Sequence, residues 1–526
     1  MLAKENRVRA CDSYSLNMHF SSLLLLGAVS ASVTASRHVV HEERSVVPPG
    51  WMKHSRLDPE TVLPVRIGLT QSNLDKAYDI LTDVSDDESP NYGNHWSDKQ
   101  IADFFAPSRH TFSTVRSWLN ASGISTKRIQ QSSNRGWLHF EATVAEMEEL
   151  LKTKYWKYEH DTGKAHSSCH EYSVPEHVTK HIDFITPTIH FDAQVPRGSG
   201  MKIKRSATDG PGMSNGPRIG KTVPAPPKNL GNTFVGGSAC NQYDFVTPAC
   251  LRELYNLPRG TKNLSSFGIV EYFPQTYLQS DLNAFQSIMV TNDAGMPEGT
   301  SPNTEAIDGG SVLTPDELGS YAADYYAESD LDLQYAMDLV WPQQVTLFQT
   351  GDNGTDSAGV ISFNNFLDGI DGVYCNTAGG DTPGFDQSFP DANGYNHTED
   401  CGLWAPTSVI STSYGYNEHD LSPAYERRQC NEYMKLGLKG VSFIYSSGDN
   451  GVGGNGASCI APDGSYTDGS SGRFNPLFPG TCPYVTTVGA TELAANNTAS
   501  APEVACESVI YSGGGFSNVF ASESCD

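Results

Sequence analysis

The alternation of apolar and polar residues divides the chain into two structured regions. In the first, residues 37–191, apolar residues at every second position predict strands over Val65–Leu69 and Trp137–Ala142. Apolar residues at helical spacing predict helices over Leu74–Thr82, Trp96–Ala106, His110–Ala121 and Val144–Lys154. The mixture indicates one compact α+β domain.

The second region, residues 240–526, alternates short apolar runs with helical ones. The expected strands are Phe267–Tyr272, Val345–Phe348, Ser408–Ser411, Val441–Ser446 and Tyr484–Val488. The expected helices are Ser280–Val290, Tyr321–Val340 and Ser422–Leu438. This order predicts an α/β fold with a mostly parallel sheet flanked by helices. Active sites in such folds gather at the carboxyl ends of strands, where two Gly-rich breaks stand, residues 446–451 (SSGDNG) and 512–516 (SGGGF).

Residues 192–239 between the two regions are rich in Gly, Pro, Ser and Asn. This stretch is basic within an acidic chain, with seven Lys and Arg against two Asp. It is predicted to be an exposed, cleavable linker, with Lys204-Arg205 as the favoured processing point. Just before it stand six histidines: His160, His166, His170, His177, His181 and His190. They are interpreted either as solvated surface residues or as an acid-triggered interface, because an unperturbed His titrates near about pH 6.5.

Composition narrows the class of protein. A chain of 526 residues is expected to form two or three domains. Its net charge of −26 and the lack of a basic stripe argue against nucleic acid as a partner. The apolar run Phe20–Ala31 is too short to span a bilayer and predicts a secretory signal peptide within residues 1–35, with Met18 as an alternative start. We therefore expect a secreted, extracellular protein with no membrane partner.

In a secreted protein the eleven cysteines would lie in an oxidising environment, where disulfides form. They are scattered and form no CxxC pair, so disulfides are expected rather than zinc. Nine of them fall between Cys240 and Cys525, an odd number that suggests a missing partner. Five glycosylation sequons, at Asn120, Asn263, Asn353, Asn396 and Asn496, agree with secretion.

The stretch Tyr325–Tyr335 (YYAESDLDLQY) carries the first candidate chemistry. On a helix, Glu328 and Asp332 fall within the apolar arc, four residues apart, whereas Asp330 and Asp338 fall on the opposite, polar arc. Two carboxylates aimed at a core are costly unless they are paired, neutralised or used. They are either a structural hydrogen-bonded pair or part of a site.

Asp449 is the third carboxyl of interest. It follows an apolar strand and lies between two glycines, so it is either a turn residue or a group that faces the helix carboxylates. Three acidic groups in one pocket cannot all ionise cheaply, and at least one should keep its proton. Such a site would suit an enzyme that works in acid.

Four motifs in order resemble the sedolisins, or serine-carboxyl peptidases. They are YYAESDLDLQY, SVISTSYG (Ser408–Gly415), SSGDNG (Ser446–Gly451) and SGGGFSNVF (Ser512–Phe520), and residues 46–191 resemble the family's activation prodomain. The fungal tripeptidyl-peptidase and aorsin-like branches look most similar. The resemblance implies a subtilisin-like fold, an acid-active peptidase made as a zymogen, and a prodomain that acts as intramolecular inhibitor and chaperone. We expect a monomer that acts on peptides and proteins.

The resemblance also implies roles for residues. Glu328 would be the general base of a Ser-Glu-Asp triad, Asp332 would orient Glu328, and Asp449 would be the protonated oxyanion-hole acid. Glu271 and Tyr414 match positions that extend this network in some members.

The sequence departs from the family in one respect. The family's nucleophile lies in a Gly-Thr-Ser-x-Ser segment well downstream of the SGGGFS loop, and this sequence stops at Asp526. Gly299-Thr300-Ser301 is too early in the order and is interpreted as a decoy. The catalytic domain is thus expected to lack its C-terminal part, its nucleophilic Ser and the family's calcium site, and this chain is expected to be inactive.

Three alternatives remain open at this stage. One is an aorsin-type acid endopeptidase with a preference for basic P1 residues. Another is a non-catalytic truncated isoform that binds or inhibits. The last is a glycoside hydrolase, for which paired carboxylates roughly 5–5.5 Å apart would suit a retaining mechanism, although glycosidase carboxylates usually come from different strands.

Overall fold

The computed structural model describes residues 37–44, 47, 51–132, 134–160, 165–191, 240, 246–261, 265–289, 296–318, 322–352, 363–375, 394–493, 502–507 and 510–521. The predicted signal peptide (1–35) and linker (192–239) lie outside these residues, as does Cys525. None of the helices in these ranges combines the length and the apolar content that crossing a membrane requires.

The first domain is α+β, as predicted. A four-stranded antiparallel sheet runs in the order β4-β5-β3-β9, beside a three-stranded sheet, β2-β6-β7, and the pair β1-β8. The strands are β1 His38–Glu43, β2 Trp51–Arg56, β3 Val62–Leu69, β4 Gln130–Gln131, β5 Trp137–Thr143, β6 Trp156–His160, β7 Ala165–Ser168, β8 Glu171–Pro175 and β9 Ile182–Thr186. The helices are α1 Ala77–Ser85, α2 Asp98–Phe105, α3 Arg109–Ala121 and α4 Val144–Leu151.

Local chemistry explains where these elements begin and how they pack. Capping boxes start α2 at Ser97 and α4 at Thr143, where the side chain of each N-cap residue accepts from a backbone N–H three residues on. Alternate residues of β3, such as Val65 and Ile67, are buried in the same cluster as Val115 of α3. The period-two pattern of the sequence therefore marks a real core.

A six-stranded sheet forms the centre of the second domain. Its order is β11-β12-β10-β13-β15-β17, and every neighbouring pair is parallel, which confirms the predicted parallel sheet. The strands of this domain are β10 Phe267–Tyr272, β11 Asn303–Ile307, β12 Val345–Thr350, β13 Val409–Thr412, β14 Tyr416–Asn417, β15 Ser442–Ser446, β16 Leu477–Phe478, β17 Thr486–Val488, β18 Thr491–Leu493 and β19 Glu503–Ala505. The helices are α5 Pro248–Leu254, α6 Gln279–Ile288, α7 Pro315–Leu318, α8 Ala322–Val340, α10 Phe363–Ile370 and α11 Pro423–Leu438.

The strand order sets where a site can form. After β10 the chain moves to β11 and β12 on one side, and from β13 onward it builds the other side. The carboxyl ends of β10 and β13 therefore flank the switch point, where ligands bind in open α/β sheets.

The two faces of this sheet bury different side chains. Ile269 of β10 packs with Leu333 and Met337 of α8 on one face. Val270 and Tyr272 belong to the core on the other face, which includes residues of α10 and α11. Because side chains alternate along a strand, Glu271 is directed to the same face as Ile269, toward α8.

The predicted polar arc of α8 is wrong. Asp330 and Asp338 are both buried, because α5 and α6 pack against this helix. Asp330 Oδ1 accepts a hydrogen bond from the backbone N–H of Leu278, just before α6, at 2.9 Å. Asp338 Oδ2 lies 3.7 Å from Arg252 Nη2, a residue of α5. Both faces of the helix are covered, so periodicity alone could not separate a core face from a solvent face.

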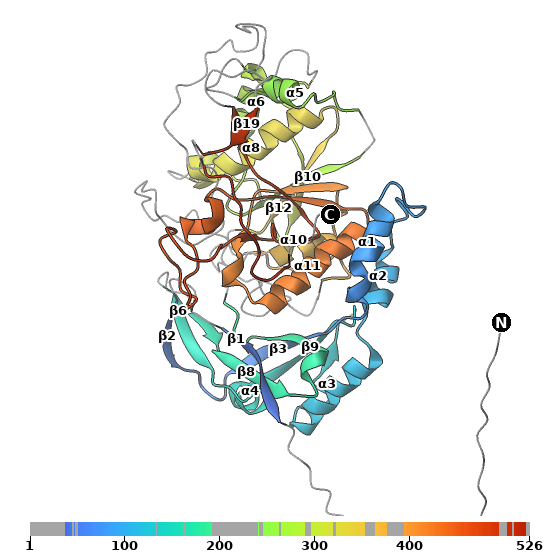
Figure 1. Ribbon diagram of the computed structural model, residues 1–526, viewed down its shortest axis with the longest axis vertical. Helices are drawn as coiled ribbons and strands as arrows, with labels where there is room; N and C mark the ends of the chain where they lie inside the picture. Colours follow the sequence, from blue (N-terminus) through green and yellow to red (C-terminus); the bar gives the residue numbers. More distant parts are fainter. Residues whose placement is uncertain are drawn as a thin grey trace, which may run out of the picture. The chain divides into compact units, whose positions relative to one another are not determined.

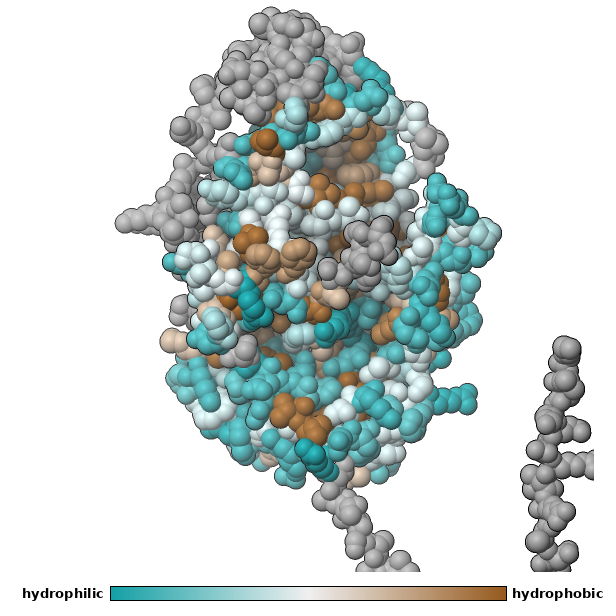
Figure 2. Space-filling view, in the orientation of Figure 1, coloured by the Kyte–Doolittle hydropathy of each residue, from teal (hydrophilic) through white to brown (hydrophobic). Residues whose placement is uncertain are grey.

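The two domains share core contacts. Met434 and Leu438 of α11 are buried with Ala77 and Val84 of α1 and with residues of α2, and these helices lie side by side in Figure 1. On the face shown in Figure 2 the first domain is mostly hydrophilic, with small apolar patches. Many of its apolar side chains are buried in its own core or against α11, although others, such as Met52 and Tyr78, are exposed.

Arg428 of α11 joins the two domains most closely. Its Nη1 donates to the Leu69 carbonyl at 3.0 Å and to Asp183 Oδ2 at 2.7 Å, and its Nη2 donates to the Gly136 carbonyl at 3.1 Å. The guanidinium carbon also lies 4.2 Å from the ring centre of Trp137. All four partners belong to the first domain.

The histidines fit neither expectation as a group. His170 and His177 are exposed, whereas His166, His181 and His190 are buried. His190 does lie at the junction, where its Nε2 is 2.8 Å from Ser422 Oγ. Burial lowers its pKa to about 3 and that of His166 to about 4. They stay neutral near pH 6.5, so they are not triggers at that pH.

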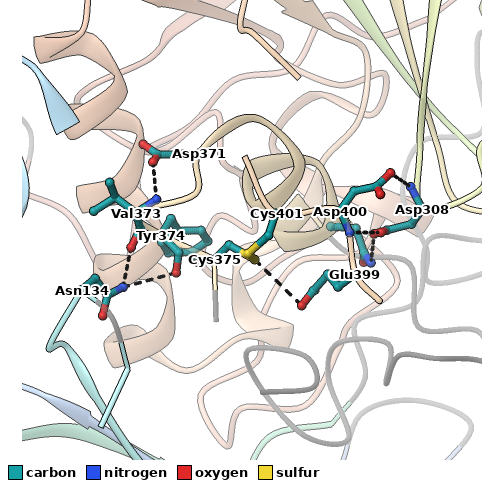
Figure 3. The surroundings of a disulfide bond; sticks show 10 residues. Asn134, Asp308, Asp371, Val373, Tyr374, Cys375, Glu399, Asp400 and Cys401 are labelled. Carbon is teal, nitrogen blue, oxygen red and sulfur yellow. Dashed lines mark hydrogen bonds between the residues drawn. A yellow bond between two sulfur atoms is a disulfide. The ribbon is translucent and has the colours of Figure 1, made fainter. Parts of the chain in front are cut away.

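Three disulfides confirm the expectation drawn from the cysteines: Cys240–Cys250, Cys375–Cys401 and Cys430–Cys482. Cys169, Cys459 and Cys506 are free and buried. Near Cys375, the side-chain amide of Asn134, from the first domain, donates to the carbonyl of Val373 at 2.6 Å (Figure 3). The Cys375–Cys401 disulfide therefore supports a loop that the first domain also contacts.

Candidate active site

Glu328 and Asp332 lie on α8 where this helix faces the sheet. Glu328 is 6% exposed, and one of its carboxylate oxygens, Oε2, has no hydrogen-bond partner. Asp332 Oδ2 accepts a hydrogen bond from Ser413 Oγ at 2.7 Å. Since Ser413 directly follows β13, the pair sits over the carboxyl end of this strand.

Glu271 and Tyr414 form a second pair below the first. Glu271, next to last in β10, is fully buried. Its Oε2 accepts a hydrogen bond from the Tyr414 hydroxyl at 2.6 Å, and its Oε1 has no partner. Adjacent strands thus bring Glu271 and Tyr414 together beneath α8.

Asp449 stands in the loop after β15, which is held by the SGGGF loop. The backbone N–H of Tyr511 donates to the Asp449 carbonyl, and that of Gly513 donates to the Gly448 carbonyl. A Cβ at position 513 would lie 1.8 Å from the carbonyl oxygen of Ser447, so only glycine permits this approach. The two Gly-rich motifs of the sequence are therefore one structural unit.

The carboxyl groups of these elements affect one another. Burial raises the pKa of Glu328 well above its ordinary value, and Asp332 and then Asp449 raise it further. Burial raises the pKa of Asp332 to about 6, while the Ser413 hydroxyl opposes this rise. Burial likewise raises the pKa of Glu271, with Asp332 and Glu328 adding to it. The structure thus brings together all the predicted acidic residues.

A cluster of four carboxyl groups can both accept and donate protons. Four carboxyls in mutual range cannot all be charged, so part of the cluster holds protons above the ordinary pH range of Asp and Glu. An ionised member can act as a general base, and a protonated one can donate a hydrogen bond to a developing oxyanion.

Sequence reasoning missed Ser413, although it lies in a motif that was singled out. The position of Ser413 next to Tyr414 was the signal that could have drawn attention to it. The sequence alone does not show that its hydroxyl reaches Asp332. The early Gly299-Thr300-Ser301 segment is far from the cluster. Ser301 precedes β11 and so lies at the amino end of a parallel strand, whereas the carboxyl cluster lies at the opposite edge.

Among the described residues, one group of side chains comes close enough together to be considered for a calcium ion. Asp368, Cys375 and Glu399 have ligand atoms within 4.8 Å of one another. The Cys375 sulfur is bonded to Cys401, as Figure 3 shows, which leaves two carboxylates. Calcium takes about six to eight oxygen ligands, so these residues do not fit it.

Comparison with known proteins gives consistent results. Residues 49–191 match the family model described as Pro-kumamolisin, activation domain. Tripeptidyl-peptidase sed1 of Aspergillus fumigatus is 41% identical over 513 residues, which cover 96% of this chain and 76% of that protein. Aorsin of Aspergillus oryzae is 38% identical over 522 residues, with the same two coverages. A solved structure, Pseudomonas sedolisin (serine-carboxyl proteinase) complexed with pseudo-iodotyrostatin, is 20% identical at a TM-score of 0.33 over 53% of this chain and 64% of that one, too weak a likeness to bear on the fold.

Proposed function

This chain belongs to the sedolisin family of serine-carboxyl peptidases, and we propose that it is the zymogen of a secreted, acid-acting tripeptidyl-peptidase. One observation carries the proposal: Glu328 and Asp332 face Glu271 and the Asp449 loop at the carboxyl edge of a parallel sheet. Glu328, Asp332 and Asp449 come from motifs that the sequence analysis names, and Glu271 from a position that matches the family's extended network.

In the proposed mechanism the carboxyls divide their roles by protonation. Glu328 takes the proton of a serine hydroxyl, and its free Oε2 is the atom available to do so. Asp332 orients Glu328 and is itself oriented by Ser413. Asp449, when protonated, donates a hydrogen bond to the oxyanion of the tetrahedral intermediate. The mechanism needs acid because Asp449 must keep its proton, while a carboxylate base remains usable where a histidine base would be charged.

We propose that the serine is that of a Gly-Thr-Ser-x-Ser segment, the nucleophile motif that the resemblance implies, which residues 1–526 do not contain downstream of the SGGGFS loop. The sequence of the full transcript shows whether the gene encodes such a segment. Purified residues 1–526 are expected not to hydrolyse peptides, and release of product by them would contradict the assignment of Glu328 as a base without its serine.

The role of each carboxyl is tested in the gene product that contains the serine. Glu328→Gln should lower kcat by about 10³-fold or more, and Asp449→Asn by about 10²–10³-fold. Glu298→Gln, an exposed glutamate of the same domain, is the matched control. Unchanged activity in Glu328→Gln would overturn the mechanism.

Exopeptidase and endopeptidase activity are separated by blocking the substrate's amine. A tripeptidyl-peptidase should cleave peptides with a free N-terminus and reject their N-acetylated forms. Cleavage of both forms after basic residues would instead favour the endopeptidase alternative, since a relative named aorsin is similar over the same span.

A further inference from the structure

A cavity of about 520 Å³ lies between the first domain and the amino-terminal end of α11. Carboxylates line it from both sides: Glu42, Glu43 and Asp183 of the first domain, and Glu418, Asp420 and Glu426 of the second. Three arginines line it as well: Arg44, Arg427 and Arg473. The six carboxylates therefore outnumber the three arginines, and His41, His190 and His419 complete the titratable lining.

Glu426 is the unusual member of this set. It lies on the first turn of α11, its side chain is fully buried at the cavity wall, and neither of its carboxylate oxygens has a hydrogen-bond partner. A buried carboxyl with no partner is costly in either protonation state. The neighbouring Arg427 favours the ionised form of Glu426 through its charge but gives it no hydrogen bond, since its Nη2 donates to the carbonyl of Val519 at 3.2 Å.

The other charged groups of the cavity have contacts of their own. Among the carboxylates, Glu42 accepts from Tyr172, Asp183 from Arg428, Glu418 from Ser517 and Asn518, and Asp420 from Tyr466, while Glu43 lies 3.8 Å from His170. Among the arginines, Arg44 donates to Ser168 and Ile189, and Arg473 to Asn518. Glu426 is thus the carboxylate of the cavity for which the described residues supply no donor.

A planar organic cation suits this site better than a metal ion. In the described residues, the cluster of side chains at metal-binding distances is Asp368, Cys375 and Glu399, outside the cavity. A guanidinium offers a fork of N–H donors that matches both oxygens of one carboxylate. The cavity is also large enough for a long side chain.

We propose that this cavity binds a cationic side chain through Glu426, and that the chain's own linker, residues 192–239, provides it. The linker starts two residues after His190, which lines the cavity together with Ile189. Its first basic residues are Arg197, Lys202, Lys204 and Arg205. Arg197 stands six residues beyond Phe191, a stretch that reaches up to about 20 Å when extended. Position and charge therefore both favour the linker as the occupant.

Trypsin tests this proposal directly, because it needs the same basic side chains that would be docked. The rate of cleavage at each basic linker residue is measured by mass spectrometry in residues 1–526, in Glu426→Gln and in Glu298→Gln. At least one of the four residues nearest the cavity should be cut about tenfold more slowly in the wild type than in Glu426→Gln, as expected for one charge-assisted hydrogen-bonded contact. Glu298→Gln should keep this protection.

A second measurement does not depend on how the variant folds. Agmatine, a small guanidinium compound, should compete with the linker and speed cleavage at the protected residue in the wild type. Equal cleavage rates in wild type and Glu426→Gln, with no effect of agmatine, would overturn the proposal. If agmatine raises the Tm of the wild type while the linker is unprotected, the assignment of the linker as occupant is wrong. None of these readouts depends on peptidase activity, so they do not test the proposed function.

Discussion

Replacing Arg428 by alanine should loosen the first domain from the second. The Arg428 side chain is 6% exposed, and its guanidinium donates three hydrogen bonds into the first domain, one of them to Asp183. Hydrogen bonds that involve a charged group contribute about 1.5–3 kcal/mol each and are not additive. Removing one member of a buried ion pair costs about 3–5 kcal/mol. We take the lower figure, because Asp183 is 23% exposed and regains water when its partner is lost.

A loss of about 3 kcal/mol corresponds to an association about 100-fold weaker. To measure this weakening, a protease site is engineered into the linker and the linker is cut. The dissociation constant between the two domains is then determined. Arg427→Ala is a matched control, because the neighbouring Arg427 is exposed and its hydrogen bond among the described residues goes to the carbonyl of Val519, within the second domain. It should change the constant by no more than about twofold.

The double variant Arg428→Ala with Asp183→Asn separates the ion pair from the backbone contacts. If the ion pair dominates, the double variant should be little weaker than Arg428→Ala alone. If Arg428→Ala binds as tightly as Arg427→Ala, then Arg428 does not hold the domains together, and this reasoning is refuted.

Three further predictions follow from single contacts. Asp330 has an ordinary pKa of 3.8, which burial raises to about 7. Its protonated form thus contributes stability that is complete below about pH 4 and lost as the pH rises through 7. Asp330→Asn should flatten the fall of the urea midpoint between these pH values, and an unchanged slope would contradict this. Tyr414→Phe removes the donor to Glu271 and should lower the free energy of unfolding by about 1–2 kcal/mol in urea titrations; no loss would mean that the bond adds nothing. Replacing Cys375 and Cys401 together by serine opens a bridge with a sequence separation of 26 residues and should cost about 3 kcal/mol in the same assay, whereas an equal midpoint would show that the loop is held by other contacts.

The sequence predicted those features that depend on local pattern. The parallel strands carry short apolar runs between helices, and the arc position of Glu328 and Asp332 follows from helix geometry alone. Each of these predictions rests on residues that lie close to one another along the chain. The structure confirms the parallel sheet and brings the two carboxylates to the side of the helix that faces the sheet.

The features that were not predicted depend on distant partners. Two consecutive arginines, Arg427 and Arg428, look alike in the sequence, yet one is exposed and the other is buried. The partners of Arg428 lie 245 to 359 residues away along the chain. The burial of Asp330 likewise depends on α6, a separate helix. No periodicity along α8 or α11 carries this information.

The acidic site depends on strand register as much as on residue type. Glu271 is next to last in β10, Ser413 directly follows β13 and Asp449 lies in the loop after β15, while α8 supplies Glu328 and Asp332. A shift of one residue in β10 would turn Glu271 to the opposite face of the sheet. The carboxyls brought together in this way repel one another when ionised, so protonation in acid stabilises the same arrangement that the proposed mechanism uses. The proposed activity needs a proton on Asp449, and the packed carboxyls repel one another less when some of them are protonated, so raising the pH should weaken both the activity and the stability of the site.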